Sequence, residues 1–290
     1  MSFNPSDSVP NVLSIDFESW VHTYPFRGMD SIRRKRLDDG FVFRAGMKLL
    51  EILNRHKVTA TFFIVSEISK WYPELIEEIE MQGHEIALHS HTHRILCSKS
   101  VLVDEMNQSA DFIRRFNVRG FRAPRLYFKQ EYMEVLSRFE IVYDSSTYGS
   151  WKAINHVNGV AEIPISAWVY SYSNRNRSYF GPLNWKALRE FFPFGSPYVM
   201  GLFRRFVLNC IQLENKAKRP TIVCIHLWQI IHPDDFYKFM LQFLSHDILS
   251  LPYCIKCQRV VEELLKAVKI ITMRQFSDNY FWNINRNEKT

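Results

Sequence analysis

Two histidines at a metal-binding spacing are the sharpest chemical signal in the sequence. His89 and His93 lie four positions apart in the run HSHTH. One helical turn would bring both side chains to the same face, where they could share a metal ion, and would direct His91 elsewhere. The structural alternative is a histidine-rich turn that caps a helix. Catalytic zinc takes three protein ligands and keeps one position open for water, so a third ligand must come from another segment.

A pair of carboxylates supplies a candidate for that ligand. Asp16 and Glu18 stand two positions apart, directly after the apolar run 12–15. Residues i and i+2 of an extended segment lie on the same side. One carboxylate can therefore bind the metal while the other takes a proton from water. Beside the histidine pair, this spacing indicates metal-assisted hydrolysis.

Polar residues follow apolar, strand-like runs at several places in the chain. They are Asp16, His89, Arg122, Asp144 and His226. Barrel enzymes place their chemistry at the C-terminal ends of parallel strands. We therefore expect these five side chains to meet at one rim of the fold.

The elements that would position these residues alternate along the chain. Alternation between short apolar runs, typical of buried strands, and longer helical patterns favours a mainly parallel sheet or barrel. Strands are expected over 12–16, 58–65, 85–88, 118–121, 141–143, 162–165, 221–225 and 270–273. Helices are expected over 41–56, 73–81, 101–116, 131–138, 202–213, 236–243 and 260–268. Residues 145–183 are rich in Ser, Tyr, Asn and Gly and look like a long excursion.

These motifs together resemble the polysaccharide deacetylase family, also called the NodB-homology family or carbohydrate esterase family 4. Residues 83–93 (GHEIALHSHTH) are similar to the family motif GHEIxxH[ST]xxH. FRAP at 121–124 resembles its FRxP motif, and YDSS at 143–146 resembles its fourth motif. EIP at 162–164 and HLWQ at 226–229 are similar to the subgroup found with exopolysaccharide clusters, which has HPWE.

The resemblance covers about residues 12–273 and implies the fold. The expected fold class is α/β, a single distorted (β/α) barrel of the NodB-homology type. We expect this catalytic domain over residues 1–276, followed by a polar C-terminal tail over 277–290.

The resemblance also assigns a role to each matching residue. Asp16 would be the general base and His226 the general acid. Arg122 would keep Asp16 ionised, and Asp144 would orient His226 and raise its pKa. A divalent metal, with Zn²⁺ as the expected ion, would be held by Glu18, His89 and His93.

The substrate side of the site is assigned to Pro124, Arg125 and Trp228. A backbone N–H near Pro124 would stabilise the oxyanion, and Trp228 could line a sugar site or pack in the core. The sequence departs from the family pattern at three places. It has Asp-x-Glu in place of consecutive aspartates, Arg125 where an aromatic residue often follows the proline, and Gln229 in place of a carboxylate.

The reaction implied is hydrolysis of an N-acyl group, with acetyl as the expected group, from an amino sugar. The substrate would be a glycan or a lipid-linked glycan precursor in polysaccharide biosynthesis. One alternative is an amidase that acts on a small cyclic or linear amide, as allantoinase-like relatives of this fold do. The other is a catalytically inactive glycan-binding module, which would lack one of the residues that carry the chemistry.

Composition limits partners and location. The chain of 290 residues has a formal net charge of +7, but its basic residues are scattered and no nucleic-acid-binding module is visible, so no nucleic-acid partner is expected. No signal peptide or membrane-spanning run is visible, which predicts a cytoplasmic location. The aromatic and basic segment 191–206 could be a peripheral contact with a membrane or a partner. A packed barrel helix with a lip is the preferred interpretation of it.

Overall fold

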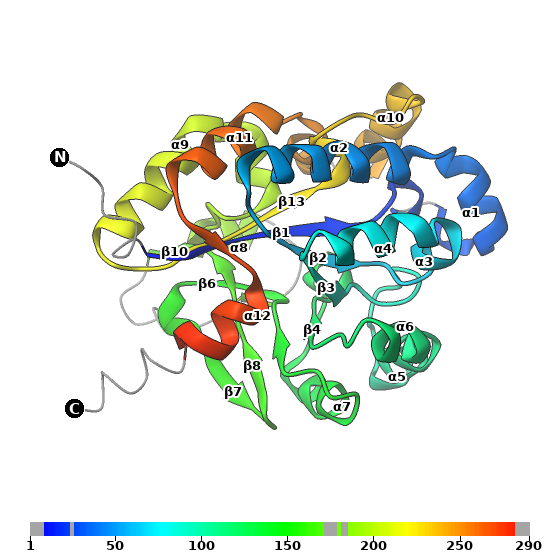
Figure 1. Cartoon of the computed structure of the whole chain (residues 1–290), viewed down its shortest axis with the longest axis horizontal. Coiled ribbons are helices and arrows are strands. Elements are labelled where there is room, and N and C mark those ends of the chain that lie inside the picture. The colour runs from blue at the N-terminus through cyan, green and yellow to red at the C-terminus, as the bar shows by residue number, and fades with distance from the viewer. Residues whose placement is uncertain (1–8, 24–25, 171–178, 181–184, 247, 282–290) are drawn as a thin grey trace.

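A computed structural model describes residues 9–23, 26–170, 179–180, 185–246 and 248–281. A curled sheet forms its centre, and helices cover it (Figure 1). The strands pair in the order β13 (Ile222–His226), β1 (Asn11–Phe17), β2 (Thr61–Ile64), β3 (Glu85–Leu88), β4 (Gly120–Phe121), β5 (Tyr143–Asp144), β8 (Val160–Glu162) and β7 (Asn155–Val157), and β14 (Ile270–Ile271) lies beside β1. All neighbours are parallel except the β7–β8 hairpin. The α/β fold class predicted from the sequence is therefore confirmed.

Strand β1 is buried along its whole length. A strand covered on both faces reads as a nearly continuous apolar run, which explains why this strand was visible in the sequence. Ser14 and Asp16, two positions apart, lie on one face of the strand, and Asp16 stands near its carboxyl end. The register sets Asp16 opposite His226 on β13 and opposite Phe63 on β2.

Helices α2 (Phe41–His56) and α4 (Pro73–Met81) have the bounds that the sequence predicted. Helix α2 turns its apolar residues to the sheet, and Figure 1 shows it lying along β1. Gly46 permits this close approach, because a Cβ there would lie 3.1 Å from atoms of Leu75 and Phe17. Proline suits the first turn of α4, where its missing N–H has no partner to lose.

Two helices differ from the sequence prediction. The segment 101–116 forms two helices, α5 (Lys99–Gln108) and α6 (Ala110–Arg115), with a break at Ser109. Its hydroxyl donates to the carbonyl oxygen of Glu105 at 2.8 Å. Helix α9 (Pro197–Lys216) is longer than predicted and is kinked at Arg204.

The remaining helices surround the sheet. They are α1 (Ser31–Asp38), α3 (Ile68–Trp71), α7 (Met133–Arg138), α8 (Trp185–Glu190), α10 (Phe236–His246), α11 (Gln258–Ala267) and α12 (Met273–Gln275). Helix α1 had no counterpart in the sequence prediction, because its run RRKR has no apolar periodicity. None of the helices in the described part of the chain is long and apolar enough to cross a membrane.

The predicted excursion is partly described and forms two small sheets. One has the order β11 (Tyr179–Phe180), β6 (Thr147–Gly149) and β9 (Ile165–Ser166), and the other pairs β10 (Trp168–Val169) with β12 (Phe191–Phe192). Residues 171–178 and 181–184 lie outside the described residues. At the C-terminus a helical turn over Phe276–Phe281 crosses the boundary expected at 276, and 282–290 lie outside the described residues.

Candidate active site

Asp16 and His226 lie side by side at the carboxyl ends of β1 and β13. Their register pairing leaves Nε2 of His226 3.7 Å from Oδ2 of Asp16. The same imidazole nitrogen lies 3.4 Å from Oε1 of Glu18. The side chain of His226 retains 12% exposure, so the imidazole can be reached from outside. A carboxylate and an imidazole thus share one accessible corner of the rim.

Glu18, His89 and His93 form a buried group that could hold a metal ion. Each offers one ligand atom, and these atoms all lie within 4.8 Å of one another. Oε2 of Glu18 is 3.1 Å from Nε2 of His93. The sequence named these three residues, and the fold brings them together.

The hydrogen bonds of the two histidines fit a metal site. Nδ1 of His89 lies 2.7 Å from the carbonyl oxygen of Arg122, and Nδ1 of His93 lies 3.2 Å from the carbonyl oxygen of His22. A carbonyl oxygen only accepts, so each Nδ1 carries the proton and each Nε2 keeps a lone pair for a metal. Metal-binding histidines in proteins are commonly oriented in this way. The donor set, two imidazoles and one carboxylate, is one that divalent zinc accepts.

The histidine segment is a loop, so the helical turn expected from the spacing is wrong. Ser90 and His93 both have positive φ, 65° and 61°. Buried Glu105 holds the loop, because its carboxylate accepts from the N–H groups of His91 and Thr92 and from the Thr92 hydroxyl at 2.8–2.9 Å. His91 itself turns to Ser66, with Nδ1 2.8 Å from the hydroxyl, and does not join the metal group.

Arg122 is a fully buried cation that faces Asp16. One guanidinium nitrogen donates to Oδ1 of Asp16 at 2.7 Å, as the resemblance implied, and Nε donates to the carbonyl oxygen of Ser145 at 3.0 Å. The guanidinium also lies 4.0 Å from the centre of the Phe63 ring. Burial alone would raise the pKa of Asp16, but Arg122, with smaller contributions from neighbouring histidines, lowers it to about 2. Asp16 is therefore ionised at neutral pH.

Asp144 does not orient His226, and this expectation is corrected. Its carboxylate accepts from the backbone N–H and the hydroxyl of Ser146 at 2.9 and 2.7 Å. The same hydroxyl accepts from the N–H of Ala123 at 2.8 Å. Asp144 therefore supports the turn that begins at Arg122, and not the imidazole.

The expected rise in the pKa of His226 is also wrong. Burial lowers the pKa of His226 to about 4, although the nearby Asp16 carboxylate acts in the opposite direction, and smaller effects of His89 and Arg122 add to the lowering. Asp144 meanwhile shares a buried site with Glu162. Burial raises the pKa of Asp144 to about 6 and that of Glu162 well above its usual value. Two carboxyl groups so near each other cannot both ionise easily, so the pair retains a proton.

Trp228 is packed behind His226 and does not form a sugar-stacking surface. The residue is 2% exposed, and its ring stacks on the imidazole with centroids 4.6 Å apart and planes at 12°. The indole N–H donates to the carbonyl oxygen of Tyr253 at 2.9 Å. Core packing, the alternative left open for Trp228, is what the structure contains.

Comparison with known proteins identifies one family over part of the chain. Residues 37–143 match the sequence profile of the polysaccharide deacetylase family. This segment, which carries His89, His93 and Arg122, is thus similar to polysaccharide deacetylases.

Two relatives illustrate this sequence similarity. The chain is 29% identical over 132 residues to the peptidoglycan-N-acetylmuramic acid deacetylase PdaA of Bacillus subtilis, which covers 42% of this chain and 49% of that protein. It is 35% identical over 83 residues to a chitooligosaccharide deacetylase of Sinorhizobium fredii, which covers 27% of this chain and 39% of that protein. The chain thus matches about half or less of the length of these relatives.

Solved structures show the same fold at low sequence identity. A Mycobacterium smegmatis protein assigned as a polysaccharide deacetylase superposes with a TM-score of 0.52 at 17% identity, over 92% of this chain and 93% of that one. Puue allantoinase gives a TM-score of 0.53 at 14% identity, over 83% and 85% of the two chains. Both likenesses concern the fold alone.

The departures from the polysaccharide deacetylase pattern have different structural contexts. Oε1 of Gln229 accepts from the His226 N–H at 3.2 Å while Nε2 donates to the carbonyl oxygen of Pro197 at 2.9 Å. A carboxylate could not make the second bond, which accounts for an amide at this position. Arg125 is exposed and has a φ of 53° directly after buried Pro124, so its contact with substrate stays a prediction.

Sequence reasoning missed residues that support this site without belonging to a spaced motif. Tyr253 lies edge-on to His226, with ring centroids 5.7 Å apart. Glu105 and Ser146 hold the histidine loop and the turn after Arg122. A YDSS motif signals Ser146 only through the family resemblance, and nothing in the sequence around Glu105 or Tyr253 distinguishes them from ordinary helix and loop residues.

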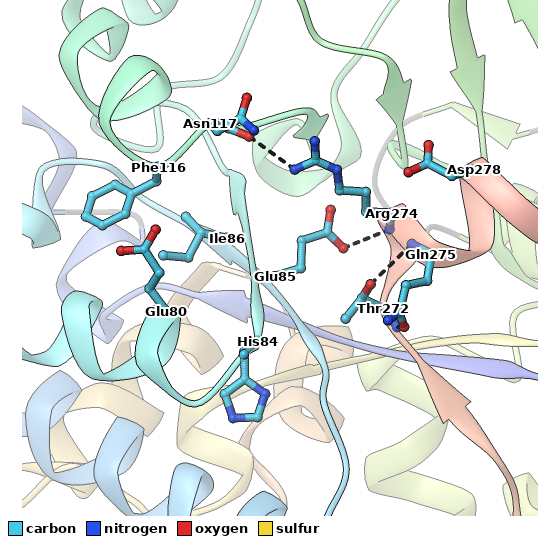
Figure 2. Close-up of a pocket in the computed structure, with 11 residues that line it drawn as sticks. Glu80, His84, Glu85, Ile86, Phe116, Asn117, Thr272, Arg274, Gln275 and Asp278 are labelled. Carbon is cyan, nitrogen blue, oxygen red and sulfur yellow. Dashed lines mark hydrogen bonds between the residues drawn. The ribbon is translucent and has the colours of Figure 1, made fainter.

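A separate pocket of about 410 Å³ lies at the opposite ends of the strands (Figure 2). Its lining includes His84 and Glu85, at the start of β3, and Arg274 near the C-terminus. Glu85 accepts from the backbone N–H of Arg274 at 2.8 Å. None of the proposed catalytic or metal-binding residues lines this pocket.

Proposed function

We propose that this chain is a polysaccharide deacetylase that removes an N-acyl group, in particular N-acetyl, from an amino sugar of a glycan or a lipid-linked glycan precursor. A divalent ion, with Zn²⁺ as the expected metal, would be held by Glu18, His89 and His93. The observation that carries the proposal is the pairing of this three-residue group with Asp16 and His226 at one rim. Amide hydrolysis needs both an activated water and a proton for the leaving amine.

The residues of the chain can divide these tasks. Asp16, ionised beside Arg122, accepts a proton from the attacking water. The hydroxide adds to the acyl carbon, and a backbone N–H near Pro124 is the proposed donor to the oxyanion. His226 lies within reach of the proton on Asp16 and delivers a proton to the sugar nitrogen as the C–N bond breaks. The products are the free amine and the carboxylate, and when bound, a divalent ion supplies Lewis-acid polarisation at this site.

The retained chemistry argues against the inactive-module alternative. A glycan-binding module needs neither an ionised carboxylate paired with buried Arg122 nor two histidines with the same tautomer. The small-amide alternative is different, because allantoinase has the same fold and fold alone does not separate the two activities. The motifs shared with glycan deacetylases, together with the relatives PdaA and chitooligosaccharide deacetylase, favour the amino-sugar substrate.

A peripheral membrane contact is supported by helix α9. Leu202, Phe203 and Phe206 are 42–49% exposed, although the preferred interpretation of this segment was a packed helix. Arg204 and Arg205 are exposed between them. Aromatic side chains flanked by arginines suit the surface of an anionic bilayer. Such a contact would suit a lipid-linked substrate, and we retain the proposals of a cytoplasmic location and a biosynthetic role.

A substrate screen tests the proposed function. The purified chain, loaded with Zn²⁺, is incubated with N-acetylglucosamine oligomers, peptidoglycan fragments, a lipid-linked N-acetylglucosamine and allantoin. Release of acetate from at least one acetylated sugar, abolished in Asp16→Asn, is the expected result. Turnover of allantoin without acetate release from any sugar would support the amidase, and no turnover with full metal loading would support the inactive module.

A further inference from the structure

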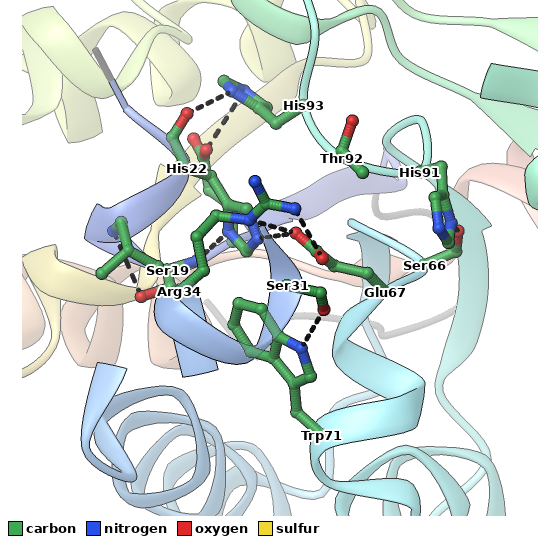
Figure 3. Close-up of polar contacts among 12 residues, drawn as sticks. Ser19, His22, Ser31, Arg34, Ser66, Glu67, Trp71, His91, Thr92 and His93 are labelled. Carbon is green, nitrogen blue, oxygen red and sulfur yellow. Dashed lines mark hydrogen bonds and ion pairs between the residues drawn. The ribbon is translucent and has the colours of Figure 1, made fainter. Parts of the chain in front are cut away.

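A buried polar chain runs away from the proposed metal site through His22 (Figure 3). The carbonyl oxygen of His22 lies 3.2 Å from Nδ1 of His93. The ring nitrogen Nε2 of His22 lies 2.9 Å from Oε1 of Glu67. His22 is fully buried, and His93 and Glu67 are each 2% exposed. The proposed ligand His93 is therefore connected to Glu67 by one intervening residue.

Glu67 makes a bidentate ion pair with Arg34. Nε of Arg34 donates to Oε1 and a terminal nitrogen donates to Oε2, both at 2.8 Å. Arg34 comes from α1 and is 5% exposed. The backbone N–H of Glu67 also donates to the carbonyl oxygen of His91 in the histidine loop at 3.2 Å. Glu67 thus joins α1, the segment after β1 and the loop that carries His89 and His93.

The ring of His22 is fixed on every side. Its Nδ1 accepts from the backbone N–H of Ser19 at 3.0 Å, so Nε2 carries the proton that is donated to Glu67. The ring stacks on Trp71 with centroids 5.2 Å apart and planes at 10°. Ser19 directly follows the proposed ligand Glu18. One imidazole therefore fixes the backbone next to Glu18, while the carbonyl group of the same residue orients His93.

We propose that Arg34, Glu67 and His22 form an outer shell that positions Glu18 and His93 and thereby sets the affinity for the metal ion. They are positioning residues, because none of them belongs to the proposed ligand group or to the Asp16–His226 pair. Buried ion pairs of this kind are weak contributors to stability, since desolvation offsets most of their attraction. Residues that orient ligands, by contrast, commonly affect metal affinity strongly. The inference rests on the metal site of the proposed function, but not on the reaction.

The test is a metal-affinity measurement on folded protein. Glu67→Gln removes the charge that Arg34 and His22 face, and His22→Ala removes the ring that joins Ser19 to Glu67. Each variant is stripped of metal, checked by circular dichroism and thermal unfolding, and titrated with Zn²⁺ against a chromogenic chelator. We expect each substitution to raise the Kd for Zn²⁺ about 10- to 100-fold. Arg34→Lys keeps the positive charge but loses the bidentate contact with Glu67, so its Kd for Zn²⁺ should lie between those of wild type and Glu67→Gln.

Glu214→Gln is the matched control. Glu214 is a buried carboxylate on α9 that pairs with Arg219 at 2.7 Å and accepts from Trp168 at 2.8 Å, in contacts separate from the metal group. This variant should lose stability but keep the Kd for Zn²⁺ within about twofold. An unchanged Kd in folded Glu67→Gln and His22→Ala would overturn the proposal. So would a loss of Zn²⁺ affinity in Glu214→Gln as large as that in the outer-shell variants. If Glu67→Gln does not fold, the Kd of Arg34→Lys decides in the same way.

Failure of this inference is distinguishable from failure of the proposed function. A wild-type chain that binds Zn²⁺ with the expected pattern of variants but releases no acetate would leave the outer shell standing and refute the deacetylase activity. A chain that releases acetate while Kd stays unchanged in the variants would do the reverse.

Discussion

Asp16 and His226 occupy the same register position of two adjacent parallel strands. Parallel neighbours bring their carboxyl ends to one edge, so two residues from opposite ends of the chain lie 3.7 Å apart between Oδ2 and Nε2. Arg122 holds the other oxygen of the Asp16 carboxylate. Asp16 therefore presents one oxygen to a cation and one to His226.

The first prediction concerns the metal ligands. His89→Ala should lose bound Zn²⁺, because its Nε2 is one of three proposed ligand atoms, whereas His91→Ala should retain it. Metal content per chain after dialysis, measured by mass spectrometry, checks both. Retention of metal in His89→Ala together with loss in His91→Ala would reverse the assignment.

The second prediction concerns the base. Asp16→Asn should bind Zn²⁺ but lose about 10²- to 10⁴-fold in kcat, because an amide cannot accept the proton of the water. Acetate release from whichever acetylated sugar is the substrate measures the loss, and metal analysis provides the control. A variant with near wild-type turnover would move the base to another residue.

The third prediction separates the two roles considered for Trp228. If this ring supports His226, Trp228→Leu should lower kcat and leave KM within about twofold, because the stacking contact acts on the reacting group. A sugar platform would instead show itself as a higher KM. Trp151→Leu, at a tryptophan that is partly exposed, is the comparison variant. A rise in KM with unchanged kcat in Trp228→Leu would contradict the positioning role.

The fourth prediction concerns pH and stability at His84, away from the active rim. Burial lowers the pKa of His84 to about 4, and its Nδ1 accepts from the N–H of Ala60 at 3.2 Å. Between pH 6.5 and 4 the unfolded chain binds a proton that the folded chain resists, so this residue destabilises the fold as the pH falls. The contribution is on the order of 2 kcal/mol at pH 4.5.

His84→Asn should remove this dependence, because an amide oxygen can still accept from Ala60 and does not titrate. Urea unfolding at pH 7 and at pH 4.5 gives the loss of unfolding free energy for wild type and for His84→Asn. The contributions of the other titrating groups cancel when the two losses are subtracted. Equal losses of unfolding free energy in the two proteins would show that His84 is protonated in the folded state.

The fifth prediction concerns helix α9. The double substitution Phe203→Ser and Phe206→Ser should reduce sedimentation with vesicles that contain phosphatidylglycerol, because it removes exposed aromatic area beside Arg204. Binding of wild type should weaken with salt and be absent on neutral phosphatidylcholine vesicles. Leu241→Ser, an exposed apolar residue on α10, is the matched control. Equal sedimentation of all three proteins would exclude a membrane contact through α9.

Local patterns were enough for much of the fold. Helix α2 was predicted with its observed bounds because its apolar residues recur at helical spacing, and α4 because proline and glycine mark its ends. The strand β1 was visible because a strand buried on both faces needs a continuous apolar run. The members of the proposed metal group were also named in advance, since Glu18, His89 and His93 stand in recognisable motifs.

Tertiary structure decided which neighbour each of these side chains has. The sequence could not place Asp144 on Ser146 and Glu162, because hydrogen-bond partners depend on how strands curl and not on motif order. The sequence could not predict either that Trp228 packs behind His226. Nor could spacing distinguish a helical turn from the loop that Glu105 holds by three hydrogen bonds.

The sequence by itself determined the residue types of the site and the strand ends on which they stand, because these depend on short-range pattern. The electrostatics were decided by the folded chain. The pKa of His226 falls to about 4 chiefly because folding buries the imidazole, and His22 gains its proposed role only because Glu67 and His93 lie next to it. Burial and long-range contact set the energy of a charge, and neither is written in the local order of residues.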